Sequence, residues 1–217
     1  MGTNYSSCEM KTPVRPRRRY ARSTPQRELS MERAHLDELI ELENHHWWHI
    51  TKRNIATDLL RKYVPPPARI IEGGIGAAGN LLNLKQSGYD VSRLDIIEDS
   101  VTHAKSIGID EIYKHDLQQP WPVAQDSFGG VVLLDVLEHV ADPVKVLKEA
   151  AKIIQGTGKI VFTIPAYLFL FSDWDERRGH YRRYTLAMIR DQFAATGLKT
   201  EKLRYWNSFT FPAAIFI

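Results

Sequence analysis

The sequence predicts an α/β fold in which a doubly wound, mostly parallel β-sheet follows an N-terminal helical cap. From residue 69 onward, short runs rich in aliphatic and β-branched residues alternate with amphipathic helical segments. This alternation is typical of helices that cross over between parallel strands. The chain has 217 residues, of which 43% are hydrophobic and 25% are charged. It is therefore long enough for one such domain, and its composition excludes a wholly disordered protein.

Charge is distributed unevenly along the chain. The formal net charge is +3, yet residues 11–22 hold six Lys and Arg and no acid, so the rest of the chain carries −3. Residues 1–28 lack apolar periodicity and are rich in Arg, Pro, Ser and Thr, which predicts a mobile basic tail. Such a tail favours weak contact with an anionic membrane surface. It has no fold of its own with which to read a nucleic acid, so nucleic acid is not expected as a partner.

A single cysteine and the short apolar runs indicate the compartment. Cys8 is the only cysteine, which excludes a disulfide scaffold and a cysteine-based zinc site and fits a reducing environment. The longest apolar stretches, 160–171 and 209–217, are shorter than the roughly 18 residues of a membrane-spanning helix. No apolar signal-peptide core follows the first residues. We therefore expect a cytoplasmic protein without a transmembrane segment.

Residues 29–64 are predicted to form the helical cap. Ser30 can cap a first helix that has Leu36, Leu39 and Ile40 on one face. The aromatic segment HHWWH precedes a second helix, which ends before three consecutive prolines.

Residues 65–217 contain the alternating pattern of the predicted ligand-binding domain. Its candidate strands are Arg69–Glu72, Val91–Ile97, Glu111–Lys114, Val131–Leu134, Lys159–Ile164 and Lys199–Tyr205. The clearest helix covers 142–154, where Asp142 can cap the helix and Pro143 occupies the first helical position. Thr185 can cap a second helix, which ends before a glycine. In such a sheet the ligand binds at the carboxyl ends of the strands.

A glycine-rich turn follows the first predicted strand. The run Ile70–Asn80 reads IIEGGIGAAGN, and glycines there let the backbone approach a ligand at a helix N-terminus. Three of its glycines match the GxGxxG dinucleotide fingerprint, with Asp95 about 20 residues further on. Glu72 is not part of that fingerprint, and an acid at a strand end can instead face a cationic ligand. Both interpretations stay open on these residues alone.

Several motifs over residues 41–212 resemble the class I S-adenosylmethionine-dependent methyltransferases. The first motif of that family, (D/E)-x-G-x-G-x-G, is matched by Glu72–Ala78, with Ala78 in place of the third glycine. Later segments are similar to the family's ribose-contacting acid, its adenine-contacting pair, its LEHV segment and its glycine turn: Leu94–Ile96, His115–Leu117, Leu134–Val140 and Gln155–Lys159. Segments 45–53 and 179–184 resemble a bacterial subgroup associated with surface-polysaccharide or lipid biosynthesis.

The resemblance implies a Rossmann-like sheet that binds S-adenosyl-L-methionine and releases S-adenosyl-L-homocysteine. The cofactor-binding residues that it implies are Glu72, Gly73, Gly74, Gly76, Asp95, Ile96, Asp116, Leu117 and Asp135. Carboxylates suit the hydroxyls and the ammonium group of that cofactor. We expect an enzyme that transfers the methyl group to an oxygen, nitrogen or carbon of a small molecule or of a lipid or saccharide intermediate. A homo-oligomer is an open alternative to a single chain.

Two groups of residues are candidates for the acceptor side. His139 and His180 are candidates for a general base, with a structural hydrogen-bonding role as the alternative. The substrate candidates are Trp48, Tyr181, Arg182 and Arg183. An arginine pair flanked by tyrosines can hold an anionic acceptor, or it can be salt-bridged to Asp173 or Asp175. The tryptophan can form a wall of the ligand site or anchor the cap on the sheet.

The acids near His139 also raise a metal alternative. Asp135, Glu138 and His139 can gather on one face of a helical turn, with His180 as a distant fourth ligand. Some methyltransferases that resemble this chain bind a divalent metal through E-x-x-E-H at this place. Here the first position is the shorter Asp, and the same histidine occurs in metal-free relatives. We therefore predict no metal.

The sequence departs from the family pattern in three places. Ala78 replaces a glycine, and Phe128-Gly129 stands where the family usually has Phe-Asp. The chain also ends at Ile217 in an apolar run, where the family continues to a final antiparallel strand. We therefore expect an incomplete sheet, as in a fragment or in a chain completed by a partner. Two alternatives remain: an NAD(P)-dependent oxidoreductase, favoured by GxGxxG, and a non-catalytic methyltransferase-like module, favoured by the missing strand and Gly129.

Overall fold

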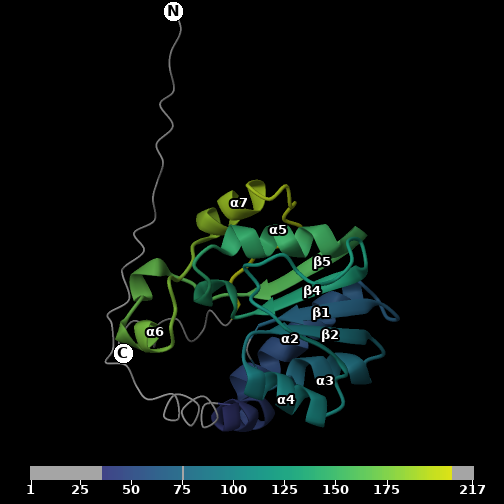
Figure 1. Cartoon of the computed structure of the whole chain (residues 1–217). Helices are drawn as coiled ribbons and strands as arrows, with labels where there is room; N and C mark the ends of the chain where they lie inside the picture. Colours follow the sequence, from purple (N-terminus) through teal and green to yellow (C-terminus); the bar gives the residue numbers. More distant parts are fainter. Residues whose placement is uncertain (1–35, 75, 207–217) are drawn as a thin grey trace, which may run out of the picture.

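The computed structural model describes residues 36–74 and 76–206, and its centre is a five-stranded sheet (Figure 1). The strands are β1 (Arg69–Gly73), β2 (Asp90–Asp95), β3 (Glu111–Lys114), β4 (Phe128–Leu134) and β5 (Ile154–Thr163). They lie in the order β3-β2-β1-β4-β5, and every neighbouring pair is parallel. The prediction of a doubly wound, mostly parallel α/β fold is therefore confirmed.

Helices cover both faces of this sheet. They are α2 (Trp47–Tyr63), α3 (Gly79–Gln86), α4 (Glu98–Ser106), α5 (Pro143–Ile153), α6 (Asp173–Arg177) and α7 (Leu186–Ala194), with short 3-10 turns η1 (Leu137–His139) and η2 (Leu168–Leu170). Helices α5 and α7 lie on one face, and α2, α3 and α4 lie on the other (Figure 1). A further helical stretch, residues 36–45, precedes α2. Its predicted start at Ser30 and the predicted tail 1–28 lie outside the described residues.

The two faces of β1 show why the sheet is buried on both sides. Ile70 and Ile71 are both fully buried, yet they belong to two separate hydrophobic clusters. Ile70 packs with Leu60 of α2 and Leu81 of α3, whereas Ile71 packs with Leu147 of α5. Successive strand residues point to opposite faces, so adjacent apolar residues feed both cores of a parallel sheet.

The predicted helix caps Asp142 and Thr185 are confirmed. The Asp142 side chain accepts a hydrogen bond from the Lys145 backbone N–H at 3.3 Å, and Pro143 begins α5. The Thr185 hydroxyl accepts a hydrogen bond from the Met188 N–H at 3.2 Å. These side chains satisfy backbone donors that a helix N-terminus leaves without partners. Helix α6 was not expected from the sequence, because its five residues are too few to show a periodic pattern.

The predicted strand Lys199–Tyr205 is wrong, because these residues have no strand conformation in the structure. Only Leu203 of this run packs against the core cluster. Its charged neighbours face outward, and Glu201 forms a 2.9 Å ion pair with Lys159 of β5. One apolar contact in seven residues does not fix a strand register. The expected final antiparallel strand concerns residues from 207 onward, which lie outside the described part of the chain.

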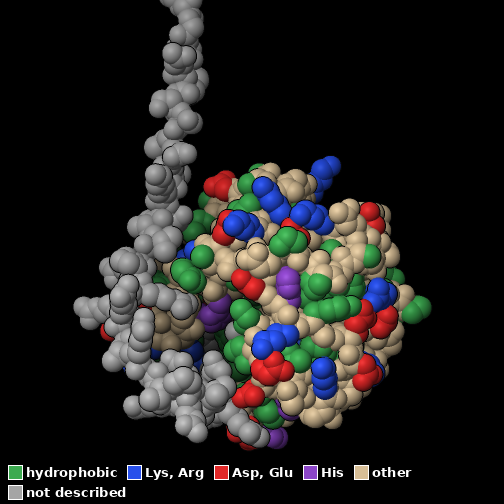
Figure 2. Space-filling model, viewed as in Figure 1, with side chains coloured by type: hydrophobic (Ala, Val, Ile, Leu, Met, Phe, Trp, Pro, Cys, Tyr) green, Lys and Arg blue, Asp and Glu red, His purple; other side chains and the backbone are tan. Residues whose placement is uncertain are grey.

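The length and polarity of the described helices bear on membrane insertion. Within residues 36–74 and 76–206, no helix is long and apolar enough to cross a membrane. On the face shown in Figure 2, basic and acidic side chains of the described residues are interspersed rather than gathered by sign.

We expect Leu133→Ala to destabilise the domain strongly. Leu133 lies in the centre of β4, is fully buried and belongs to the cluster beneath α5 and α7. Removing its side chain leaves a cavity, which lowers the free energy of unfolding by about 2–5 kcal/mol. Urea denaturation measures this change. Leu168→Ala serves as the control, because Leu168 is 48% exposed and should change stability by less than about 0.5 kcal/mol. Equal effects of the two substitutions would contradict the assigned core.

Candidate active site

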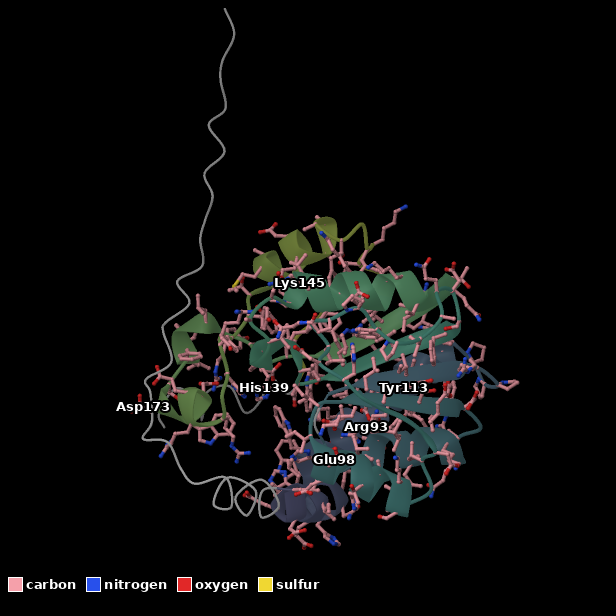
Figure 3. All side chains as sticks on the ribbon, in the orientation of Figure 1. Arg93, Glu98, Tyr113, His139, Lys145 and Asp173 are labelled. Atoms are coloured by element: carbon pink, nitrogen blue, oxygen red, sulfur yellow. The ribbon has the colours of Figure 1, made fainter. Side chains whose placement is uncertain are left out.

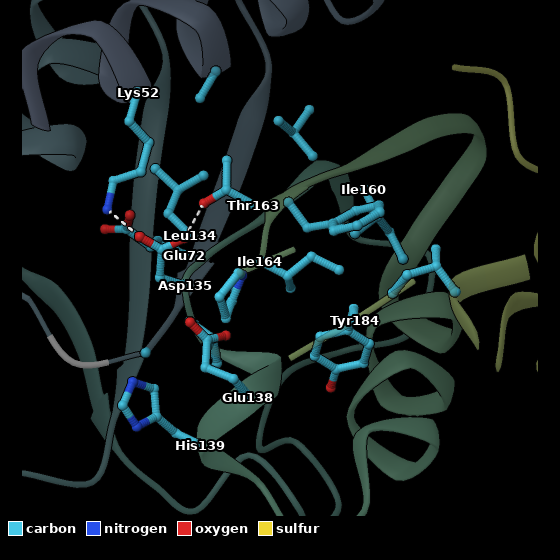
Figure 4. A pocket seen from close by; sticks show the side chains of 18 of the residues that line it. Lys52, Glu72, Leu134, Asp135, Glu138, His139, Ile160, Thr163, Ile164 and Tyr184 are labelled. Carbon is cyan, nitrogen blue, oxygen red and sulfur yellow. Dashed lines mark hydrogen bonds and ion pairs between the residues drawn. The ribbon is translucent and has the colours of Figure 1, made fainter. Parts of the chain in front are cut away.

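A large cavity lies at the carboxyl ends of the strands, where ligands bind in open α/β sheets. Its volume is about 1730 Å³, which exceeds the roughly 300–1,000 Å³ of a typical single-ligand pocket. From the strand ends it extends along β5 to Gly156 and Lys159 and along residues 197–206. Most of the sequence-predicted site residues line it: Trp48, Glu72, Gly73, Gly74, Gly76, Asp95, Ile96, Asp116, Leu117, Asp135, His139, His180 and Arg183. Part of this wall is shown in Figure 4.

The glycine turn between β1 and α3 forms the floor of this cavity. Gly74 has a φ of +122°, and a Cβ on it would lie 2.4 Å from the Val136 side chain, so only glycine fits there. Its N–H donates to the Leu94 carbonyl at 3.0 Å, which ties the turn to β2. Ala78, which replaces the family's third glycine, adopts a left-handed conformation with φ 62°. A non-glycine residue therefore occupies a backbone conformation that favours glycine.

A buried arginine that sequence reasoning missed supports this turn from below. Arg93 is 1% exposed and lies among the β2 side chains in the interior (Figure 3). Its Nη2 donates to the carbonyls of Gly74 at 3.0 Å and Gly76 at 2.8 Å, and to the Ser100 hydroxyl at 2.9 Å. The same nitrogen forms a 2.5 Å ion pair with the Asp95 carboxylate. Arg93 therefore joins the turn, β2 and α4 in one polar cluster.

Asp95, the predicted ribose-contacting acid, is fixed by this cluster. Its Oδ2 pairs with Arg93, and its Oδ1 accepts the Ile97 N–H at 3.0 Å. The side chain is fully buried at the edge of the cavity. The next residue, Ile96, is 53% exposed and offers an apolar surface at the same strand end.

Glu72 lies near the carboxyl end of β1 beside the glycine turn, and the strand continues one residue beyond its predicted end, to Gly73. It is 9% exposed, and its Oε1 accepts a hydrogen bond from the Asn80 Nδ2 at 2.8 Å. Burial raises the pKa of the Glu72 carboxyl, and the nearby Glu43 carboxylate adds to this rise, while Arg93 and Asn80 oppose it. Glu72 is thus an acid whose charge is not neutralised by a direct ion pair among the described residues.

Asp135, at the end of β4, is held by a lysine of the cap. Its Oδ2 receives Lys52 Nζ at 2.7 Å and its Oδ1 receives the Thr163 hydroxyl at 2.7 Å (Figure 4). Burial alone would raise the pKa of Asp135, but the Lys52 ammonium and the two hydrogen bonds outweigh burial and lower it. Asp135 also has a φ of +55°, a conformation that is uncommon outside glycine and that often marks functional sites.

The predicted adenine-contacting pair follows β3. Asp116 accepts the Gln118 N–H at 2.9 Å and lines the cavity. Leu117 is buried against Gly73, where a Cβ on the glycine would lie 3.0 Å from the leucine side chain. These two residues therefore close the cavity on the β2–β3 side of the turn.

Glu138, His139 and His180 gather on the opposite side of the cavity. Their ligand atoms lie within 4.8 Å of one another, and the two imidazole rings meet edge-on with centroids 4.7 Å apart. Glu138 is 1% exposed, and its buried Oε2 has no hydrogen-bond partner among the described residues. Burial raises the pKa of Glu138 well above its ordinary value, and the Asp135 charge adds to the rise. In Figure 4, Glu138 lies between Asp135 and His139.

A buried aspartate that the sequence suggested only as an ion-pair partner orients this group. Asp175 Oδ1 lies 2.8 Å from His180 Nδ1, and Arg183 Nε donates to both Asp175 oxygens at 2.9 and 3.0 Å. Burial would raise the pKa of Asp175, but Arg183 and His180 lower it. Asp175 is thus charged, and it aligns His180 at the cavity wall.

The set of residues that could bind a metal differs from the one that the sequence suggested. Glu138, His139 and His180 could hold a metal ion, whereas Asp135 is not part of this cluster. The Asp135 oxygens instead accept hydrogen bonds from Lys52 and Thr163.

The four substrate candidates separate into two pairs. Trp48 and Arg183 line the cavity, and the Trp48 ring lies 4.4 Å from that of Trp206. Arg182 instead donates to the backbone carbonyls of Val140 at 3.1 Å and Ala141 at 2.9 Å. Neither Arg182 nor Tyr181 is among the described residues that line the cavity.

Gly129, the departure that removes a common acid of the family, is remote from this site. It lies near the amino end of β4, where a Cβ would come within 3.1 Å of Val64 and 3.3 Å of Ala68. The site is at the carboxyl end of the same strand. This departure therefore concerns packing beneath α2 rather than ligand binding.

The parallel sheet, the glycine turn and the acidic strand ends define the class of this domain, which is that of the class I S-adenosylmethionine-dependent methyltransferases. A model of the methyltransferase domain family matches residues 47–203. The chain belongs to this family.

Individual relatives are distant. The ubiquinone biosynthesis O-methyltransferase of Aliivibrio fischeri is 28% identical over 107 residues, which cover 44% of this chain and 46% of that protein. The chain thus matches about half the length of the curated relatives. The YcgJ protein of Bacillus subtilis has a similar fold, with a TM-score of 0.61 at 16% identity over 74% of this chain and 77% of that one. The 1,6-didemethyltoxoflavin-N1-methyltransferase of Burkholderia thailandensis was solved with 1,6-didemethyltoxoflavin and S-adenosylhomocysteine bound. Its fold matches with a TM-score of 0.56 at 14% identity, over 82% of this chain and 81% of that one.

The raised pKa of Glu138 predicts a pH-dependent loss of stability. A group whose pKa is higher in the folded state favours folding below its ordinary value, 4.5, and loses that contribution as the pH rises through the folded pKa. Glu138→Gln has no such titration. As the pH rises above 4.5, the free energy of unfolding of the parent should therefore fall relative to that of Glu138→Gln. The difference changes by up to about 1.4 kcal/mol per pH unit.

Urea denaturation at pH 5, 6, 7 and 8 measures this difference. Glu98→Gln is the control, because the hydrogen bond from Lys114 lowers the pKa of Glu98, and its contribution changes only below pH 4.5. The Glu98 difference should stay flat in this range. A flat Glu138 difference would show that this acid titrates normally.

Proposed function

We propose that this protein is an S-adenosylmethionine-dependent methyltransferase that acts on a small-molecule or lipid-linked acceptor. The observation that supports this proposal most directly is the position of Glu72 and Asp135. Glu72 is near the carboxyl end of β1 and Asp135 directly follows β4, and the order of the sheet reverses between these two strands. Ligands bind at this switch point in doubly wound folds. Two carboxylates beside a glycine turn suit a ligand that carries cationic groups and hydroxyls.

The residues at the strand ends fit that cofactor. Glu72 and Asp135 place negative charge in the buried part of the cavity, where electrostatic attraction is stronger than in water. The glycine turn offers backbone groups at close approach, and Asp116, Leu117 and Ile96 surround the β2–β3 side. When bound, the cofactor supplies an electrophilic methyl group on a sulfonium centre.

On the acceptor side, His180 is the candidate general base. Asp175 is charged and bonds His180 Nδ1, so in the neutral imidazole Nδ1 carries the proton and Nε2 is the acceptor. An acceptor that loses a proton on methylation would give it to that nitrogen. The His139 ring and the Glu138 carboxyl lie next to His180 and would face the same acceptor. Alignment of the two ligands supplies most of the rate enhancement in reactions of this type.

We expect Glu72→Gln to weaken binding of S-adenosylhomocysteine by about tenfold, because a neutral amide replaces a charge-assisted acceptor. Isothermal titration calorimetry measures the dissociation constant. Asp110→Asn is the matched control, since Asp110 is exposed and lies at the amino end of β3, away from the cavity. A parallel titration with NADH tests the oxidoreductase alternative. Binding of NADH without binding of S-adenosylhomocysteine would overturn the proposed function.

The role of His180 is tested with His180→Asn. The asparagine amide can still donate to Asp175 but has no second ring nitrogen, so methyl transfer should fall by about 10²–10⁴-fold. The measurement is transfer of labelled methyl from S-adenosylmethionine to an acceptor found by screening, with and without EDTA, because no metal is predicted to take part. Binding of S-adenosylhomocysteine should stay unchanged, and His103→Asn on α4 is the control. Full activity of His180→Asn would exclude this base.

A further inference from the structure

A carboxylate from the cap occupies the glycine turn. Glu43 lies in the helical stretch 36–45, far from the turn in sequence. Its Oε1 accepts the Ala77 N–H at 2.8 Å, and its Oε2 accepts the Gly79 N–H at 2.9 Å. Glu43 also lines the cavity beside Glu72 and Gly76. One side chain thus takes both backbone donors at the start of α3.

The start of α3 has no cap of its own. The residue before the helix, Ala78, is left-handed and has no side-chain hydrogen bond to the first turn. Such a helix start exposes N–H groups and the positive end of the helix dipole, which together favour an anion. Glu43 is the anion that these donors receive in this structure.

The same donors suit one group of the expected ligand. This step rests on the proposed function, because S-adenosylmethionine carries a single carboxylate, at its amino-acid end. A carboxylate is the anion that a glycine turn at a helix N-terminus binds through its N–H groups. Glu43 and the ligand carboxylate would therefore need the same two hydrogen bonds, and two like charges at this separation repel each other.

We propose that Glu43 is an intramolecular competitor for the carboxylate of the cofactor. Binding of the cofactor then requires the Glu43 side chain to leave the Ala77 and Gly79 N–H groups. The helical stretch 36–45 acts as a gate over the turn, and its interaction with the turn sets the affinity for ligands that have an amino-acid end.

The neighbouring residues allow such an exchange. Residue 46 is not helical, so the stretch 36–45 is separated from α2 by a break. Arg53 of α2 donates to the Glu43 carbonyl at 3.1 Å. A Cβ built on Gly79 would lie 2.7 Å from both Arg53 Nη1 and Glu43 Oε2. The Arg53 side chain and the Glu43 carboxylate therefore both lie beside the backbone at Gly79.

The test compares two ligands that differ only at the end in question. S-adenosylhomocysteine has the carboxylate, whereas 5′-methylthioadenosine lacks the whole amino-acid end. In Glu43→Gln the charge is lost and one acceptor becomes a donor, so the side chain holds the turn less well. By calorimetry, this variant should bind S-adenosylhomocysteine about tenfold more tightly than the parent. Its affinity for 5′-methylthioadenosine should stay within about twofold.

The control is Glu41→Gln, which removes an equal charge from the same helical stretch. Glu41 is 77% exposed and faces His45 rather than the turn, so both affinities should match those of the parent. Urea denaturation checks that each variant is folded, and Glu43→Asp provides a second variant whose shorter arm should also release the donors.

The outcomes separate the two proposals. Unchanged or weaker binding of S-adenosylhomocysteine by folded Glu43 variants, with normal binding by the parent, overturns the competition and leaves the proposed function intact. An equal change for both ligands also overturns it, because the effect would not depend on the carboxylate. Failure of the parent and all variants to bind either nucleoside overturns both proposals.

Discussion

The buried guanidinium of Arg93 is the interaction on which the ligand site depends. A charge inside a protein is costly unless it is paired and its donors are used. Here Nη2 pairs with Asp95 and donates to the carbonyls of Gly74 and Gly76, while the buried Nε and Nη1 have no hydrogen-bond partner among the described residues. The glycine turn has no side chains with which to hold itself, so these carbonyls need a donor from elsewhere. Arg93 supplies it and joins β1, α3 and β2 at the point where the cavity begins.

This constraint also explains how the acids of the site come to differ. Asp95 forms an ion pair with Arg93, and Asp135 forms an ion pair with Lys52. Glu72 and Glu138 have no ion pair of their own among the described residues, and burial raises the pKa of both. When the environments of two acids shift their pKa values in opposite directions, the two acids can serve different chemical roles in one site. All four acids line the cavity, two of them beside a cation and two without one among the described residues.

The sequence was informative wherever structure depends on neighbours along the chain. The caps Asp142 and Thr185 follow from residue type, and the strand end at Glu72 follows from an apolar run before glycines. The wrong strand at Lys199–Tyr205 had the composition of a strand but only Leu203 against the core. Contacts between distant segments had no local signal.

Several of those distant contacts decide the site. Lys52 and Asp135 are 83 residues apart, and Glu43 reaches the turn across 34 and 36 residues. Nothing in the spacing of a helix predicts which strand end its lysine will meet. Arg93 did have a signal, because an arginine two residues before Asp95 shares its face of β2. A charged residue on a strand that is buried on both faces must find an acid and carbonyls nearby.

These long contacts change the meaning of the division between a cap at 29–64 and a ligand-binding domain at 65–217. The cap supplies the cation that fixes Asp135 and the anion that fills the glycine turn, so the electrostatics of the cavity belong to both segments. Movement of the cap would alter the charge near Glu72 and Asp135 together, because Lys52 and Glu43 lie on helices joined at residue 46. The cap therefore contributes to the cavity and, through Ala56 and Leu60 of α2, also to the core on one face of the sheet.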